Sequence, residues 1–365
     1  MKKNILFFSL LLISISSFSQ SDYFKITGQI VDVLTRAPMQ GASVFAQNTT
    51  FGTATDAEGN FTLILPNGGY DLAVTYTDYE TKTRRITTAD ATDKILMSIQ
   101  QKDKALEAVA VVSTSEVKDG WEKYGSFFIE NFIGKTPFSQ NCILANHDSL
   151  RFYFSKRKNR LKVLSSLPVE IINNSLGYKI KYTLDSFTYD YGTQASIYTG
   201  YPLFEEIQPS DEVQRKLWQE NRVSAYNGSL LHFMRSIYNK NMQQEGFEIQ
   251  FIVDKNTDAE KAIAPKDQYG AINYNVPDSM PLVEFWPNQP DMAVLYKKEK
   301  PQQEYLDQNN DIPKDFQLSV LNIYNAIAIE QNGYYYDQYD VTINGYWTFE
   351  KVADMLPYDY KPTEK

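Results

Sequence analysis

Residues 28–63 read GQIVDVLTRAPMQGASVFAQNTTFGTATDAEGNFTL, a stretch in which short apolar runs alternate with clusters of turn-forming residues. Thr35–Gly41 is one such cluster, and Asp56–Gly59 places Asp and Gly at the first and fourth positions of a type I turn. The next apolar residues, Phe61, Leu63 and Leu65, fall on one face of a strand because side chains alternate along it. Further short strands are indicated at 70–76, 84–86 and 95–99. Strands separated by turns at intervals of about 8–12 residues predict a β-sandwich.

The same residues carry a family resemblance. The segments Gly28–Asp32, Pro38–Val44 and Gly52–Leu63 resemble the carboxypeptidase-regulatory-like domain. This resemblance implies a seven-stranded, transthyretin-like β-sandwich, found beside metallocarboxypeptidase catalytic domains and in front of TonB-dependent transporters. It does not extend to the zinc site of the carboxypeptidases, a His-x-x-Glu pair with a later His, because His147 and His232 are followed three residues later by Leu150 and Arg235.

Residues 1–19 have the three parts of a secretory signal peptide. Lys2 and Lys3 are followed by an apolar stretch from Ile5 to Phe18, and the small residues Ser17 and Ser19 precede Gln20. A membrane anchor would need ~20 apolar residues, more than this stretch offers. We therefore expect cleavage before Gln20 and export to the periplasm or cell surface, with no membrane-spanning segment in the mature chain.

Composition excludes several functional classes. The 365 residues include 36 Lys and Arg against 45 Asp and Glu, a net charge of -9, and an acidic chain is a poor partner for nucleic acid. Two histidines and one cysteine, Cys142, are too few for an expected metal site or disulfide framework. We expect no cofactor. The hydrophobic fraction of 42% is sufficient for packed cores.

After the sandwich, the sequence signals change from short strands alone to a mixture of helices and strands. We expect the sandwich to span residues 20–100, a linker or edge strand to span 101–118, and a larger α+β domain to span 119–365, so the fold class is mainly β with some α. Helices are predicted at 121–133, 211–223 and 229–242 and a three-stranded meander at 178–201; Asn344-Gly345 predicts a hairpin through a type I′ turn.

The larger domain also has a recognisable sequence. Leu176–Tyr182, Ala225–Phe233 and Gly345–Trp347 resemble a group of exported bacterial envelope proteins, in which a carboxypeptidase-regulatory-like module precedes one further domain. The resemblance implies this two-part architecture and no established activity.

Candidate chemistry is sparse. No nucleophile elbow, phosphate-binding loop or Cys-x-x-Cys pair is present. His232 falls in a predicted helix among apolar residues, which favours a packed histidine. Glu205 and Glu206 are adjacent on a predicted strand, so they point to opposite faces and are poor partners in a glycosidase pair. We predict that the chain is not an enzyme.

Three functions remain open. The leading hypothesis is a non-enzymatic envelope protein that acts as a binding or interaction module in the periplasm or at the cell surface, with an envelope protein or a glycan as its partner. The alternatives are a glycan-binding accessory protein and a carboxylate-dependent hydrolase. The candidate interaction residues are Val109 and Val111, in the apolar middle of the linker, where the sandwich could dock on the larger domain, and the aromatic run Tyr334, Tyr335 and Tyr336.

Overall fold

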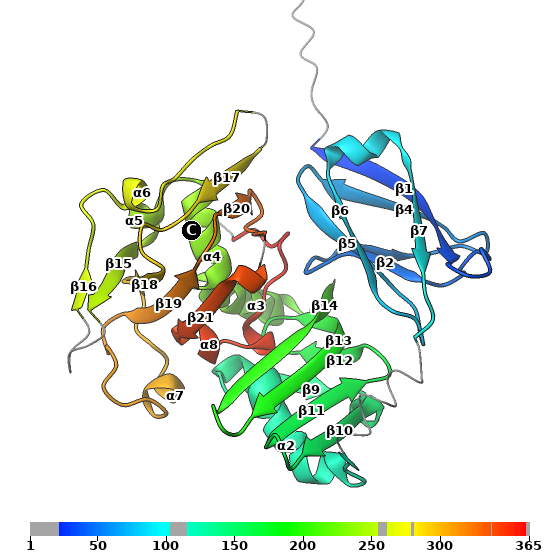
Figure 1. Ribbon diagram of the computed structural model, residues 1–365, viewed down its shortest axis with the longest axis horizontal. Helices are drawn as coiled ribbons and strands as arrows, with labels where there is room; N and C mark the ends of the chain where they lie inside the picture. Colours follow the sequence, from blue (N-terminus) through cyan, green and yellow to red (C-terminus); the bar gives the residue numbers. More distant parts are fainter. Residues whose placement is uncertain (1–21, 103–114, 255–260, 279–280, 337, 363–365) are drawn as a thin grey trace, which may run out of the picture.

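The computed structural model describes residues 22–102, 115–254, 261–278, 281–336 and 338–362. Three packed parts follow one another along the chain: a sandwich, drawn blue and cyan in Figure 1, a green sheet, and a yellow and orange sheet. The last two make up the second domain, residues 115–362. The architecture confirms the predicted fold class, mainly β with an N-terminal sandwich and a larger α+β domain.

The sandwich has the seven strands expected of it. One sheet has the order β4-β1-β7 and the other the order β3-β2-β5-β6. Phe61, Leu63 and Leu65 are all buried between the sheets, as the alternation of the sequence predicts. The strands are β1 (Tyr23–Asp32), β2 (Ser43–Ala46), β3 (Gly52–Ala54), β4 (Asn60–Pro66), β5 (Tyr70–Thr75), β6 (Lys82–Ile86) and β7 (Lys94–Ile99).

Gly28 lies where the two neighbours of β1 leave no room for a side chain. It pairs with Phe61 on β4 and Ile95 on β7 in regular register. A Cβ atom at this position would lie 2.3 Å from Phe61 Cε1 and 2.5 Å from the Ile95 carbonyl oxygen. Glycine inside a strand is typical of either a bulge or a close approach of neighbouring chains, and here the regular register and the short distances show a close approach.

The second domain begins with a seven-stranded antiparallel sheet. Its order is β8-β10-β11-β13-β12-β9, with β14 paired to the other edge of β13. Its strands are β8 (Ser115–Glu116), β9 (Cys142–Leu144), β10 (Leu150–Ser155), β11 (Arg160–Ser165), β12 (Val169–Asn173), β13 (Tyr178–Asp190) and β14 (Ala195–Glu206). The predicted meander at 178–201 is instead one long hairpin, because a register shift between Leu184 and Ser186 lets β13 continue past the expected turn.

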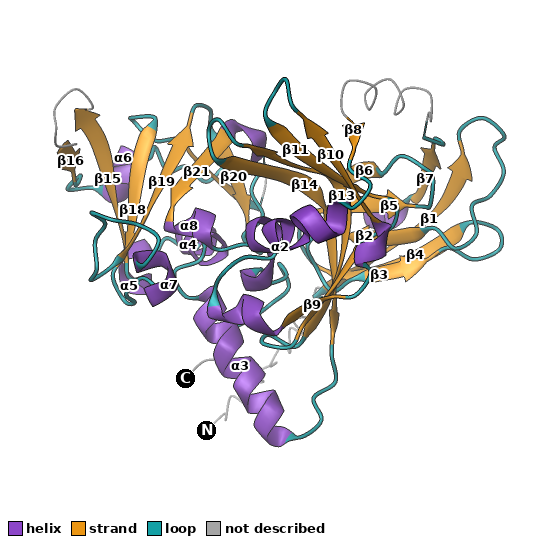
Figure 2. Cartoon of the chain, turned by 90° about the horizontal axis from the view of Figure 1, so that it is seen from below, coloured by secondary structure: helices purple, strands orange, loops and turns teal. Residues whose placement is uncertain are grey.

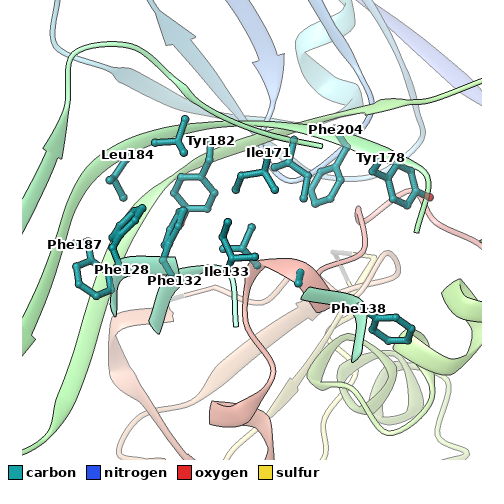
Figure 3. Packing of buried hydrophobic residues seen from close by; sticks show 14 of the residues in the cluster. Phe128, Phe132, Ile133, Phe138, Ile171, Tyr178, Tyr182, Leu184, Phe187 and Phe204 are labelled. Atoms are coloured by element: carbon teal, nitrogen blue, oxygen red, sulfur yellow. The ribbon is translucent and has the colours of Figure 1, made fainter. Parts of the chain in front are cut away.

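One helix covers a face of this sheet. Helix α2 (Gly120–Phe132) matches the predicted helix and lies along the strands in Figure 2. Phe128 and Phe132 are fully buried and meet Tyr182 and Phe187 of β13 edge to face. Figure 3 shows these rings between helix and sheet. Aromatic stacking therefore accounts for much of this first core of the second domain.

A second core follows. The helix predicted at 211–223 appears as α3 (Glu212–Tyr226), and its N-cap is Asp211 rather than Ser210. The helix predicted at 229–242 is shorter: α4 (Leu230–Tyr238) is capped by Ser229 and ends before Asn239, and a separate helical turn begins at Met242. A five-stranded sheet has the order β16-β15-β18-β19-β21, and β17 pairs with β20. The strands are β15 (Phe247–Asp254), β16 (Lys261–Ile263), β17 (Leu282–Phe285), β18 (Asp291–Tyr296), β19 (Gln317–Ile323), β20 (Ile327–Glu330) and β21 (Val341–Gly345), and the short helices are α5 (Met242–Glu245), α6 (Gln268–Ala271), α7 (Gln303–Leu306) and α8 (Tyr346–Phe349). The larger domain therefore contains two hydrophobic cores.

The hairpin predicted at Asn344-Gly345 is wrong. Gly345 has φ 78° and ψ -142° and is the residue before α8, so the chain enters a helical turn rather than a returning strand. The two residues that follow it, Tyr346 and Trp347, are buried, and Trp347 Nε1 donates to the Gly228 carbonyl at 2.7 Å. Burial of these two large rings outweighs the turn preference of the dipeptide.

Among the helices in the described ranges, none is both long and apolar enough to cross a membrane.

We predict that Gly28→Ala destabilises the sandwich. The added methyl group must displace Phe61 or the β7 backbone, and such overpacking costs roughly 1–3 kcal/mol. Thr27→Ala, at a half-buried position in the same strand, is the matched control and should cost less than about 1 kcal/mol. Urea denaturation followed by circular dichroism measures both, and equal losses for the two variants would contradict the packing argument.

Candidate functional site

The sandwich is docked on the second domain through main-chain hydrogen bonds. The loop between β2 and β3 lies beside the edge of β14, where Thr49 and Leu203 form a parallel bridge. The Asn48 N–H donates to the Pro202 carbonyl at 2.8 Å, and the Phe204 N–H donates to the Thr49 carbonyl at 2.9 Å. The loop therefore covers a sheet edge that would otherwise expose unpaired backbone groups.

Apolar contacts extend this interface. Phe45 and Ala73 lie on the sandwich sheet and form a buried cluster with Leu203 of β14. Gly52 also faces Leu203, because a Cβ atom there would lie 3.1 Å from a Leu203 methyl carbon. Next to this cluster, Thr50 Oγ1 donates to Asp359 Oδ2 at 2.6 Å.

An arginine completes the docking. We call this group the arginine clamp: Arg85 and Asp71 from the sandwich, and Glu330, Tyr334 and Tyr336 from the second domain. The Arg85 guanidinium donates to Glu330 Oε1 at 2.8 Å and lies 4.2 Å and 4.6 Å from the ring centroids of Tyr334 and Tyr336. The Tyr334 hydroxyl donates to Asp71 Oδ2 at 2.7 Å. Since the Glu330 side chain is only 7% exposed, the cation compensates a nearly buried carboxylate.

The tyrosine run, which was predicted to be an interaction surface, therefore makes its contacts with residues of the same chain. Tyr334 and Tyr336 hold Arg85, and Tyr335 is buried in the second core. Burial, with the hydrogen bond to Glu330, raises the pKa of Tyr336 to about 12. The other two candidates, Val109 and Val111, lie outside the described residues. Of the docking residues, the sequence alone singled out only the tyrosines, because Arg85 and loop 47–51 have no distinguishing local pattern.

A cleft lies between the docked sandwich and the seven-stranded sheet. It encloses about 680 Å³. One wall is the segment 75–81 of the sandwich, with Lys102, and the other comprises segments 164–168 and 183–185 of the second domain. Ligand sites commonly occupy such concave spaces at domain boundaries.

The cleft walls are polar with aromatic patches. Tyr76 is 37% exposed, and its ring meets Tyr79 edge to face at 5.4 Å. Tyr79 is fixed from behind, because its hydroxyl donates to Asp32 Oδ2 at 2.9 Å. On the opposite wall, burial raises the pKa of Asp185, while Lys102 and a hydrogen bond with Tyr201 act in the other direction. The cleft thus offers one accessible ring together with carboxylate and hydroxyl groups.

A second hollow lies inside the second domain. It encloses about 310 Å³ and is lined by Glu299, Gln302, Gln317, Glu350 and Asp354, among others. Burial raises the pKa of Asp354 to about 7 and raises that of Glu350 well above its usual value. We call this hollow the carboxyl cavity.

The remaining candidates have structural roles. Burial lowers the pKa of His232 to about 4; its Nδ1 accepts from the Gly228 N–H at 3.2 Å and its Nε2 lies 3.2 Å from Glu245. His147 stacks on Trp121 at 4.5 Å. Glu205 pairs with Lys181 at 2.5 Å, and Glu206 pairs with Arg222 at 3.0 Å. No group of three or more His, Cys, Asp or Glu side chains within the described ranges is arranged to hold a metal ion.

Comparison with known families identifies the N-terminal part. Residues 26–112 match the family model of the CarboxypepD_reg-like domain, which confirms the resemblance predicted from the turn and strand residues. A search of curated proteins gave no match.

Solved structures give only remote similarity. Two chains from type II cohesin–X-dockerin complexes of Acetivibrio cellulolyticus match at 26% and 28% identity over 20% of this chain and 51% of theirs, each with a TM-score of 0.16. A 9R-lipoxygenase from Cyanothece PCC8801 matches at 10% identity over 60% of this chain and 48% of its own, with a TM-score of 0.15. The chain thus spans about half the length of these proteins, and TM-scores this low carry no argument about fold or function.

We predict that Arg85→Gln loosens the docked sandwich. Without the guanidinium, Glu330 keeps only the Tyr336 hydroxyl, and leaving a charged group poorly satisfied costs roughly 1–3 kcal/mol. Amide hydrogen exchange should therefore accelerate in loop 47–51. Arg84→Gln is the matched control, because Arg84 pairs with Asp90 at a site where its side chain is 43% exposed. If both variants exchange like the wild type, the clamp does not hold the interface.

We also predict that Asp354→Asn changes the pH dependence of stability. The folded pKa of Asp354 is about 7 against an ordinary value of 3.8, so between these values the unfolded chain releases a proton that the folded chain retains. The wild type therefore loses stability as pH rises through this window, on the order of 1 kcal/mol per pH unit, whereas the asparagine variant does not. The opposite contribution of His232 is common to both proteins and cancels in their difference. The raised pKa of Asp354 would be contradicted if the wild type and the Asp354→Asn variant differed in free energy of unfolding by the same amount at every pH from 4 to 7.

Proposed function

We propose that this chain, whose residues 26–112 match the CarboxypepD_reg-like family model, is a non-enzymatic exported binding protein whose ligand occupies the cleft between the sandwich and the second domain. The cleft itself is the observation that carries the proposal. It combines walls from two parts of the chain, and its volume of about 680 Å³ is within the range of ordinary ligand sites.

The composition of the walls favours a saccharide. Tyr76 presents an accessible aromatic face, which suits the apolar face of a sugar ring. Ser165, Ser166 and Thr183 supply hydroxyl groups and Asp185 a carboxyl group, so a ligand rich in hydroxyls finds hydrogen-bond partners on the opposite wall. A protein partner would more often call for a contiguous apolar patch.

The proposal that the protein is exported rests on residues 1–19, which contain two lysines, an apolar stretch and small residues before Gln20, as a signal peptide does. A saccharide-binding protein in the periplasm or at the cell surface is consistent with that destination. The absence of a nucleophile motif from the sequence supports a role in binding rather than catalysis.

A saccharide panel tests the proposal. We expect the full chain to be retarded in affinity electrophoresis by at least one of soluble starch, laminarin, xylan and chitooligosaccharides. Tyr76→Ala should weaken that binding by about tenfold, the effect of losing one stacking contact worth about 1.4 kcal/mol. Asp185→Asn should weaken it as well, because a charged acceptor becomes a neutral amide.

The matched control is Tyr324→Ala, since Tyr324 is 72% exposed and does not line the cleft. It should bind like the wild type. Failure of every saccharide, or equal weakening by Tyr324→Ala and Tyr76→Ala, would contradict the cleft as the binding site. Turnover of a bound saccharide would contradict the non-enzymatic part of the proposal.

A further inference from the structure

The carboxyl cavity presents hydrogen-bond acceptors at its inner wall. Gln317 lies on β19 at 5% exposure and Asp354 follows α8 at 8%, whereas Ser224 and Lys300, which also line the hollow, are exposed. The Lys300 ammonium is 3.8 Å from Asp315 at the surface. The deeper polar wall therefore includes the side-chain oxygen atoms of Gln317 and Asp354, beside amide N–H donors of the same lining.

Two acceptors that line this cavity are without a hydrogen-bond partner among the described residues. Gln317 Oε1 is buried and has no hydrogen bond within the described part of the chain, and the same holds for Gln302 Oε1. A buried acceptor left unsatisfied costs free energy, so it is uncommon in a well-packed protein. Two such atoms in one cavity indicate that a donor from outside the chain belongs there.

The charged groups that line the carboxyl cavity indicate which kind of hydrogen-bond donor would bind there. Glu350 and Asp354 lie on one short segment. Burial raises the pKa of both carboxyl groups, and the charges of Asp354 and Glu299 raise that of Glu350 further. Asp354 Oδ2 accepts the Lys351 N–H at 3.0 Å, and Glu299 Oε1 accepts from Asn227 Nδ2 at 2.9 Å. Metal ions prefer several carboxylates converging on one point. No such convergence of three His, Cys, Asp or Glu groups occurs among the described residues.

We propose that the carboxyl cavity binds a small organic cation through a primary ammonium group. An ammonium carries three N–H donors and a positive charge, so it can satisfy Gln317 Oε1 and at the same time neutralise Glu350 and Asp354. A volume of about 310 Å³ accommodates a short alkyl diamine. This site is separate from the cleft and extends beyond the function proposed for it.

Binding is coupled to proton release. In the empty cavity, burial favours the protonated forms of Glu350 and Asp354, and a bound cation favours the ionised forms. Tyr346, Tyr198 and Cys142 are the neighbouring titratable groups on which these carboxyl groups act, and Glu299 acts on Glu350. Lys351 is the cation on the same segment; its ammonium lies 6.0 Å from the centroid of the Tyr198 ring, and only its backbone N–H is among the groups that shift the pKa of Asp354. Affinity should therefore rise with pH through the pKa of Asp354, about 7.

Calorimetric titration of the full chain with 1,5-diaminopentane tests the inference. We expect saturable binding, with proton release at pH 7 measured from two buffers of different ionisation enthalpy. Neutral 1,5-pentanediol and tetramethylammonium, a cation without N–H groups, should not bind. Glu350→Gln should weaken diamine binding by about tenfold or more, the loss of one charge-assisted contact, and Glu212→Gln, which removes the same charge from an exposed helix position, should not.

Gln317→Met gives an independent readout. It removes the unpaired acceptor at similar volume, so thermal denaturation should occur at a higher temperature while diamine binding weakens. Absence of diamine binding, equal binding of the diol, or equal weakening by Glu212→Gln and Glu350→Gln would overturn the assignment. Binding of Mg²⁺ alone with the same dependence on Glu350 would replace an ammonium site by a metal site.

Discussion

The structure depends on the buried backbone of the C-terminal segment, residues 350–360. Buried N–H and C=O groups must find partners, and this segment finds them in every part of the molecule. The Ala353 N–H donates to the Ile133 carbonyl at 2.9 Å, and the Tyr358 N–H donates to the Asn48 carbonyl at 2.7 Å. Arg235 of α4 donates to the carbonyls of Tyr358 and Tyr360 at 3.0 and 2.9 Å. The last described residues thus join the sandwich to both cores of the second domain, between which they run in Figure 1.

Both hollows follow from this arrangement. The cleft has two walls only because loop 47–51 and the arginine clamp hold the sandwich beside the seven-stranded sheet. The carboxyl cavity is enclosed where the C-terminal segment passes α3 and β19, which brings Asp354 near Gln317 although they are far apart in sequence. Changes to the docking contacts should therefore affect the cleft first, since the cavity walls belong to the second domain alone.

Elements with strong periodicity were predictable and those decided by packing were not. The sandwich strands, α2 and the N-terminus of α4 follow from alternation, amphipathic spacing and the capping residue Ser229, all of which are local. The Asn344-Gly345 hairpin failed because Tyr346 and Trp347 gain more from burial than the dipeptide gains from its preferred turn. For the candidate site, the sequence marked Tyr334 and Tyr336 but not Arg85, whose role depends on a carboxylate 245 positions away.

The sequence by itself determined the CarboxypepD_reg-like sandwich and the mainly β character of the chain, because turns and strand alternation act over a few residues. The close approach at Gly28 was decided by its neighbours Phe61 and Ile95 in the folded sandwich. Tertiary structure alone decided that the tyrosine run is used inside the chain, that loop 47–51 covers the β14 edge, and that Glu299, Glu350 and Asp354 line one cavity. Each of these three features depends on which distant residues meet in the low-dielectric interior, where an uncompensated charge or an unpaired polar group costs free energy. The size of that free-energy cost depends on neighbours in three dimensions, which local sequence patterns do not encode.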